Sequence, residues 1–166
     1  HKTVRRQRQM CIRDSYDQIE LRCIAHLAED PGLIGAFEAG DDIHTATAAA
    51  VFDIAPEDVH VEERSKAKMV SYGLAYGMEA YGLAQRLNIA VSEASEILES
   101  YFKAFPAVKQ YMEDTVELAR ERGYTETLFG RRRQIPELSS GNRQIRQAGE
   151  RQAMNAGIQG LAADIF

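Results

Sequence analysis

The stretch that decides how this chain folds is R-S-K-A-K-M-V-S-Y-G-L-A-Y-G, residues 64–77. In an α-helix its Arg64, Lys68, Tyr72 and Tyr76 recur every four positions, and each step turns by only about 40°, so they form one slowly turning stripe. The cations come first, where the helix dipole is positive, and the rings follow about 12 Å further along. The stripe has the shape of a nucleotide, with a triphosphate on the cations and a base or sugar against the rings.

The same spacing is also typical of an ordinary amphipathic helix, in which the tyrosines belong to the core and the basic residues to a solvated flank. Spacing alone favours this second interpretation. The choice between the two therefore depends on the rest of the chain.

Length and composition are those of one globular domain. The chain has 166 residues, of which 45% are hydrophobic and 27% charged, and no apolar run approaches the length of a membrane span. Its two cysteines, Cys11 and Cys23, suggest neither a disulfide framework nor a metal cluster. We interpret both as free thiols in a cytosolic protein.

Charge is unevenly distributed along the chain. The net charge of −5 by itself argues against nucleic acid. Residues 16–63 hold twelve acidic side chains and one basic, whereas residues 119–151 hold eight arginines and four glutamates. The arginine-rich section is compatible with contact to phosphates, although an uneven solvated surface explains the distribution equally well.

The chain is expected to be mainly α-helical, with one short strand and one β-hairpin. Residues 1–15 lack periodicity and resemble translated adapter sequence, so we treat them as non-native or disordered. Alternation over 16–23 predicts a short strand that runs into a helix. Caps, prolines and apolar periodicity predict helices over 31–37 and 43–51, from 62, from 92, from 106 to Gly123 and from 143, and a hairpin that pairs 125–128 with 132–135.

Several segments resemble one family, in sequence order. Y-D-Q-I-E-L-R at 16–22 and the stretch 64–77 resemble the first and second polymerase motifs of bacterial family A DNA polymerases, the DNA polymerase I type. D-I-H-T-A-T-A at 42–48, T-L-F-G-R-R-R at 127–133 and E-R-Q-A-M-N-A-G-I-Q-G at 150–160 also resemble that family. Several motifs in order are more specific than any one alone.

For residues 16–166 the resemblance implies the helical fingers subdomain with part of the palm, including one short palm strand, truncated at both ends. The implied activity of the parent enzyme is template-directed DNA synthesis, by transfer of a nucleotide from a deoxynucleoside triphosphate to a primer 3′-OH. Its implied partners are primer-template DNA and deoxynucleoside triphosphates, with no membrane. The parent is implied to be a cytoplasmic monomer.

The resemblance also implies a role for each residue of the stripe. Arg64 and Lys68 would be the catalytic cations that hold the triphosphate, with Lys68 placed to protonate the leaving pyrophosphate. Tyr72 would pack beside the sugar and Tyr76 beside the templating base. The other nucleotide-binding residues would be His44 near the phosphates, Glu20, which crowds the sugar 2′ position and so rejects ribonucleotides, and Gln18.

Two of these assignments have plain alternatives. His44 follows Asp42 at a predicted helix start, where a histidine is as often simply solvated. Glu20 taken by itself is more often a surface carboxylate.

Tyr72 stands where many members of the family carry phenylalanine, and a tyrosine there implies that the parent enzyme readily accepts chain-terminating dideoxynucleotides.

Contacts to DNA are implied in the last third of the chain. Arg151, Asn155 and Gln159 fall at i, i+4 and i+8 on a predicted helix, and this polar stripe would touch the template and primer strands through sugar edges and minor-groove acceptors. Arg131 and Arg132, at the predicted hairpin, suggest contact with backbone phosphates, although arginines at a turn are often only solvated.

The family pattern breaks at the metal site. Nucleotidyl transfer needs two divalent ions, Mg²⁺ in the parent enzyme, and these need carboxylates. Ser15 stands where the family has the aspartate before the tyrosine of its first motif, and the later aspartate motif would lie beyond Phe166. The backbone carbonyl of Tyr16 is the one ligand left, so we expect this chain to lack catalysis.

Two other functions fit parts of the pattern. A single-subunit RNA polymerase shares the architecture, but Glu20 and the dense match through 127–160 speak against it. A non-catalytic helical module that binds nucleic acid through the arginines of 119–151 is the alternative from another class. Binding of a nucleoside triphosphate alone would separate a polymerase fragment from such a module.

Overall fold

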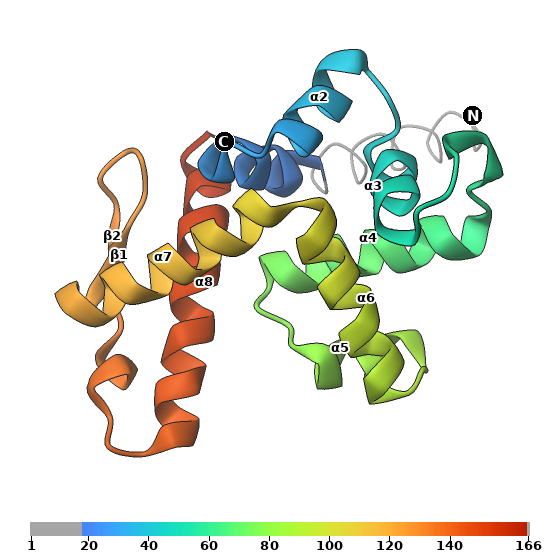
Figure 1. Ribbon diagram of the computed structural model, residues 1–166. Coiled ribbons are helices and arrows are strands. Elements are labelled where there is room, and N and C mark those ends of the chain that lie inside the picture. Colours follow the sequence, from blue (N-terminus) through green and yellow to red (C-terminus); the bar gives the residue numbers. More distant parts are fainter. Residues whose placement is uncertain (1–17, 166) are drawn as a thin grey trace, which may run out of the picture.

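Residues 18–165 are described by the computed structural model, and most of them are helical (Figure 1). A first helix covers 18–28. It is followed by α2 (Pro31–Ala39), α3 (Ile43–Phe52), the 3-10 helix η1 (Pro56–Asp58), α4 (Val61–Ala75), α5 (Ala80–Leu87), α6 (Val91–Ala104), α7 (Pro106–Arg122), β1 (Tyr124–Glu126), β2 (Arg132–Gln134), the 3-10 helix η2 (Pro136–Ser139) and α8 (Arg143–Ile165). The predicted class, mainly α with a small hairpin, is confirmed.

The strand predicted over 16–23 is wrong for the part that the structure describes, because 18–28 is helical. Leu21, Ile24 and Ala25 are all buried, and their spacing of three and four is that of a helix face. Within the described residues, the alternation over 18–23 is one end of this longer face. Eight residues are too few to distinguish the two-residue period of a strand from the 3.6-residue period of a helix.

Caps and prolines begin the helices where the sequence predicts. Asp30 caps α2, and Asp42 caps α3 by accepting hydrogen bonds from two backbone N–H groups of the first turn. Pro106 opens α7, and Gly123 ends it with a φ of 76°. Local side-chain chemistry therefore sets most of the helix boundaries.

Three elements differ from the prediction. Helix α6 begins at Val91, one residue before the predicted cap. Helix α5 was not predicted, because its eight residues include Gly82 and begin without a side-chain cap. In the hairpin Thr125 lies opposite Arg133, so the loop covers 127–131, longer than the predicted 129–131.

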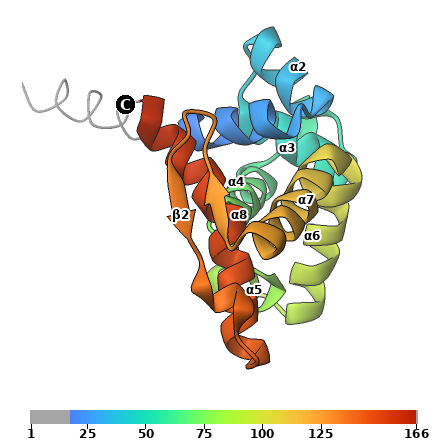
Figure 2. The same ribbon diagram turned by 90° about the vertical axis from the view of Figure 1, so that its left-hand side faces the viewer.

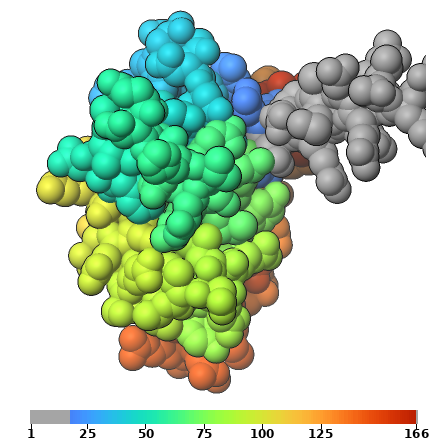
Figure 3. All heavy atoms as spheres, turned by 90° about the vertical axis from the view of Figure 1, so that its right-hand side faces the viewer, coloured from blue at the N-terminus to red at the C-terminus, as the bar shows by residue number. Residues whose placement is uncertain are grey.

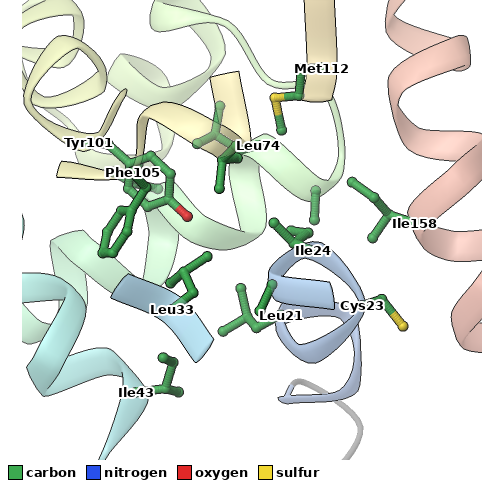
Figure 4. Packing of buried hydrophobic residues seen from close by; sticks show 14 of the residues in the cluster. Leu21, Cys23, Ile24, Leu33, Ile43, Leu74, Tyr101, Phe105, Met112 and Ile158 are labelled. Carbon is green, nitrogen blue, oxygen red and sulfur yellow. The ribbon is translucent and has the colours of Figure 1, made fainter. Parts of the chain in front are cut away.

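The main core joins the first helix to segments far away in sequence. Figures 1 and 2 show that the C-terminal end of α8 lies beside the first helix, and buried side chains from both belong to one cluster. Figure 4 shows this packing, with side chains from the first helix, α2, α3, α4, α6, α7 and α8: Leu21, Cys23, Ile24, Leu33, Ile43, Leu74, Tyr101, Phe105, Met112 and Ile158. Helix α4 is therefore held from several sides.

A smaller cluster fastens the hairpin end of the molecule. Ala119, Ile135, Leu138 and Ala153 pack together and join α7, η2 and α8. None of the helices among residues 18–165 combines the length and the apolar character needed to cross a membrane.

Candidate functional site

The predicted stripe lies along α4 and its C-terminal cap. Arg64, Lys68 and Tyr72 belong to α4, and Tyr76 is the residue that ends it, with φ −100° and ψ 11°. The N–H of Tyr76 still donates to the carbonyl of Tyr72 at 3.0 Å, so the backbone leaves the helical path only at this residue. In the face shown in Figure 3, residues of α3 and α4 adjoin above those of α5 and α6.

Three of the predicted nucleotide-binding side chains meet between α3 and α4. The ring centroids of His44 and Tyr72 lie 5.8 Å apart, with the rings tilted by 57°. The Nζ atom of Lys68 lies 5.7 Å from the centroid of the Tyr72 ring, within reach of a cation–π contact. His44 is only 5% exposed, so the alternative of a solvated histidine is wrong. The packing of α3 on α4 covers it.

Arg64 is held by a carboxylate that the sequence marks only as a helix cap. Its Nε and Nη2 atoms donate to Oδ2 of Asp42 at 3.0 and 2.7 Å. The other oxygen, Oδ1, accepts from the backbone N–H of His44 at 2.9 Å. One carboxylate therefore fixes Arg64 relative to His44, and sequence spacing gave no signal for this pair because the two partners come from different helices.

The pKa of Asp42 reflects these contacts. Partial burial would raise it, but the hydrogen bonds from Arg64 and from the backbone N–H groups of His44 and Thr45 outweigh that effect and hold the pKa below its ordinary value. Asp42 is therefore ionised at neutral pH and compensates the charge of Arg64.

The first helix contributes Glu20 to the end of α4. The hydroxyl of Tyr76 donates to Oε1 of Glu20 at 3.3 Å, so the predicted sugar-contacting and base-contacting residues lie together. Gln18 is half-buried at the start of the described residues. Tyr16, the predicted backbone ligand of a metal, lies outside them.

The described residues do not fit a two-metal site. Among residues 18–165, no group of three or more His, Cys, Asp or Glu side chains could hold a metal ion. The break in the family pattern at Ser15 lies outside the described residues. No chemical step through a metal is assigned to this chain.

Three of the predicted DNA-contacting residues, Arg151, Asn155 and Gln159, share α8, as expected. The Nη1 atom of Arg151 lies 3.2 Å from Oε1 of Glu79, in the turn between α4 and α5. Asn155 faces the same turn, because a Cβ atom on Gly77 would lie 3.1 Å from both its Oδ1 and Nδ2 atoms. Gln159 is half-buried further along α8. Glu79 is a partner that no sequence motif indicates.

The hairpin arginines are paired within the chain. Arg131 lies 2.5 Å from Asp164, Arg132 pairs with Glu126 across the strands, and Arg133 donates to Gln152 at 3.3 Å. All three arginines remain exposed. The contact of Arg131 and Arg132 with DNA phosphates stays a prediction.

A cavity of about 640 Å³ is lined in part by the turn between α4 and α5. Its walls come from α4 to α8 and are mainly apolar, with Leu74, Phe102, Met112 and Met154 among them. None of the predicted site residues lines this cavity, so the candidate site is the α3–α4 cluster together with the α8 stripe.

Comparison with known proteins identifies relatives of the whole stretch. The model of DNA polymerase family A matches residues 3–166. DNA polymerase I of Mycobacterium leprae is 55% identical over 151 residues, which are 91% of this chain and 17% of that protein. DNA polymerase I of Geobacillus stearothermophilus is 53% identical, with the same two coverages.

A solved structure has the same fold. The POL domain of Pol1 from M. smegmatis, in complex with DNA primer-template and dNTP, matches with a TM-score of 0.84 and 53% identity over 89% of this chain and 26% of that chain. The chain thus spans only a small part of the relatives that it matches.

Proposed function

Since the chain belongs to DNA polymerase family A, we propose that residues 16–166 form the fingers and part of the palm of an enzyme that carries out template-directed DNA synthesis. The proposed reaction of the whole enzyme transfers a nucleotide from a deoxynucleoside triphosphate to a primer 3′-OH. Similarity to proteins named DNA polymerase I favours this function over a single-subunit RNA polymerase. We place the enzyme in the cytoplasm as a monomer.

The observation that carries the proposal is the cluster of one cation and two rings between α3 and α4. Lys68 lies over the ring of Tyr72, and the buried His44 packs against the same ring. Arg64 and Lys68 bind the triphosphate, where charge moves from the breaking bond to the pyrophosphate. Lys68 donates the proton to that leaving group.

The remaining contacts of the nucleotide follow from the neighbours of this cluster. His44 lies near the phosphates and Tyr72 beside the sugar. Glu20 excludes a 2′-hydroxyl because it fills the space that the group would need. Tyr76 lies beside the templating base, and Gln18 completes the nucleotide site from the first helix.

Primer-template DNA is the second proposed partner. Arg151, Asn155 and Gln159 contact the template and primer strands from α8, and Arg131 and Arg132 contact backbone phosphates. The solved relative from M. smegmatis is a complex with DNA primer-template and dNTP, which supports both partners here.

The metal ions of the reaction are proposed to be Mg²⁺, which neutralises phosphate charge and activates the attacking oxygen when bound. Because residues 18–165 offer no carboxylate cluster, we expect the 166-residue chain to be inactive by itself. A primer-extension assay with magnesium on the purified chain should show no template-dependent product. Extension of the primer by the chain would contradict this expectation.

Titration of a deoxynucleoside triphosphate into the purified chain tests the nucleotide site. We expect weak binding by calorimetry that becomes weaker with added salt, and Lys68→Ala should reduce the affinity by about tenfold, the effect of one charged hydrogen bond. Lys103→Ala, on the exposed side of α6, is the matched control and should leave affinity unchanged. A non-catalytic module that binds only DNA would show no nucleotide binding in either protein.

A further inference from the structure

The turn between α4 and α5, residues 76–79, rests on the polar stripe of α8. Gly77 in this turn is buried and has a φ of 66°. A Cβ atom added to it would lie 3.2 Å from Cβ of Arg151 as well as 3.1 Å from the amide of Asn155. Two of the three stripe residues are therefore in direct contact with the turn.

The contact with Arg151 is an ion pair that a phosphate could replace. Its Nη1 atom lies 3.2 Å from Oε1 of Glu79, and the two side chains are 38% and 69% exposed. An exposed pair of this kind contributes little to stability. A DNA phosphate that approached Arg151 would compete with Glu79 for the same guanidinium group.

The contact with Asn155 covers a polar atom. Its Oδ1 atom is buried and accepts no hydrogen bond from any described residue. Buried polar atoms are normally hydrogen-bonded, and an orphaned one is costly. The amide of Asn155 therefore gains a partner only if the turn moves away or a ligand reaches it.

We propose that the turn 76–79 is an autoinhibitory cover on the α8 stripe, in which Glu79 competes with a DNA phosphate for Arg151. The inference rests on the proposed DNA contact of Arg151 and assigns that contact to a backbone phosphate, in place of the sugar edges and minor-groove acceptors that the family resemblance implies. When a phosphate binds Arg151, Glu79 is released, and the turn no longer holds Asn155. Because the turn begins with Tyr76, at the end of the nucleotide stripe, DNA binding at α8 changes the contacts of the nucleotide site.

The test measures DNA affinity by fluorescence anisotropy, with a labelled primer-template duplex and the full 166-residue chain. Glu79→Gln keeps the shape of the side chain and removes its charge. It should raise the affinity about two- to fivefold, which corresponds to the loss of one exposed competing ion pair. Arg151→Gln should lower the affinity, because a phosphate contact is lost.

Removal of any negative charge favours DNA binding to some extent, so two controls isolate the competition. Glu99→Gln removes an exposed charge from α6 and measures the general effect. The double variant Glu79→Gln/Arg151→Gln measures the coupling, since the gain from Glu79→Gln should fall to that of Glu99→Gln once Arg151 is absent. Circular dichroism of each variant verifies that the helices are retained.

The outcomes separate the inference from the function on which it rests. One outcome is that the chain binds DNA, that Arg151→Gln lowers the DNA affinity, and that Glu79→Gln raises this affinity no more than Glu99→Gln does. The competition is then refuted, and the DNA contact of Arg151 stands. If Glu79→Gln raises the DNA affinity by the same factor with and without Arg151, the competition is also refuted. If the chain binds no DNA, or Arg151→Gln changes nothing, the proposed DNA contact of α8 fails and the inference fails with it.

Discussion

Single carboxylates hold three side chains of the candidate site. Asp42 accepts from Arg64, Glu20 accepts from Tyr76, and Glu79 pairs with Arg151. Each acceptor comes from a different element from its donor, so these contacts orient the site residues across helix boundaries. Exposed pairs are weak, and this makes them exchangeable for phosphate oxygens.

Asp42 gives the site a dependence on pH whose sign follows from its lowered pKa. The folded-state pKa lies below the ordinary value of 3.8, so the ionised carboxylate stabilises the fold above that value, and this contribution is lost as the pH falls through the folded-state pKa. Asp42→Asn should therefore destabilise the chain at neutral pH and differ less from the parent chain near pH 3. Urea unfolding at the two pH values measures this.

The control for that experiment is the neighbouring Asp41, which is exposed and does not cap α3. Asp41→Asn should change the free energy of unfolding by less than Asp42→Asn at neutral pH. Equal pH dependence of Asp42→Asn and the parent chain would show that the contact with Arg64 contributes nothing to stability.

Tyr72 leads to a prediction about substrate choice in the whole enzyme. Its ring lies near both Lys68 and His44, and its hydroxyl would replace the contact that a missing 3′-OH leaves vacant. Tyr72→Phe should therefore reduce incorporation of dideoxynucleotides relative to deoxynucleotides, by on the order of tenfold or more for the lost polar contact. Single-nucleotide incorporation assays with both substrates measure the ratio, and equal ratios for the two versions would refute the assignment.

At the scale of elements, the C-terminal end of α4 and the turn that follows it connect the α4 stripe to α8. The helix stops at Ala75, and the following turn brings Glu79 and Gly77 against α8. The turn needs a positive φ at Gly77 and leaves no room for a side chain there. One residue without a Cβ atom therefore allows the turn after α4 to lie directly against α8.

Gly77→Ala should destabilise the chain by about 1–3 kcal/mol, because the positive φ is strained for alanine and the new methyl group meets Asn155. Gly35→Ala is the matched control. Gly35 lies in α2 with nothing within 4 Å of the added Cβ, and the change there should be neutral or stabilising by about 0.4–1 kcal/mol. Thermal or urea unfolding compares the two, and an equal effect would argue against the close approach.

At the scale of the molecule, the two ends of the described chain share one core. Side chains of the first helix belong to the same buried cluster as Ile158 and Leu161 of α8, so unfolding of either end would expose apolar surface of this shared core. We expect the described residues to unfold as one cooperative unit.

Cys23 reports on this cooperativity. It is 3% exposed, and burial, with a smaller effect of Glu20, raises the pKa of its thiol, which lowers the reactive thiolate fraction. In a Cys11→Ser variant, the thiol of Cys23 should react with a disulfide reagent at least tenfold more slowly in buffer than in denaturing urea. Equal rates in the two solutions would show that the isolated chain does not fold around this core.

The sequence by itself determined the helical class, most helix boundaries and the stripe on α4. These depend on contacts between residues close together in the chain: the cap at Asp42, prolines at helix starts, and side chains that recur every four residues. The motifs also identified the family, because several of them occur in the right order. Patterns of this kind depend only on residues close together in the chain, so they can be recognised without knowledge of the packing.

Only the tertiary structure decided which residues face the stripe from other elements. It made 18–28 a helix, buried His44 against Tyr72, and brought Asp42 to Arg64 and Glu79 to Arg151. Partners such as Glu79 and Arg151 are 72 positions apart, and no periodicity connects residues at that distance. Their meeting is set by how the helices pack around a shared core, which depends on all apolar faces at once.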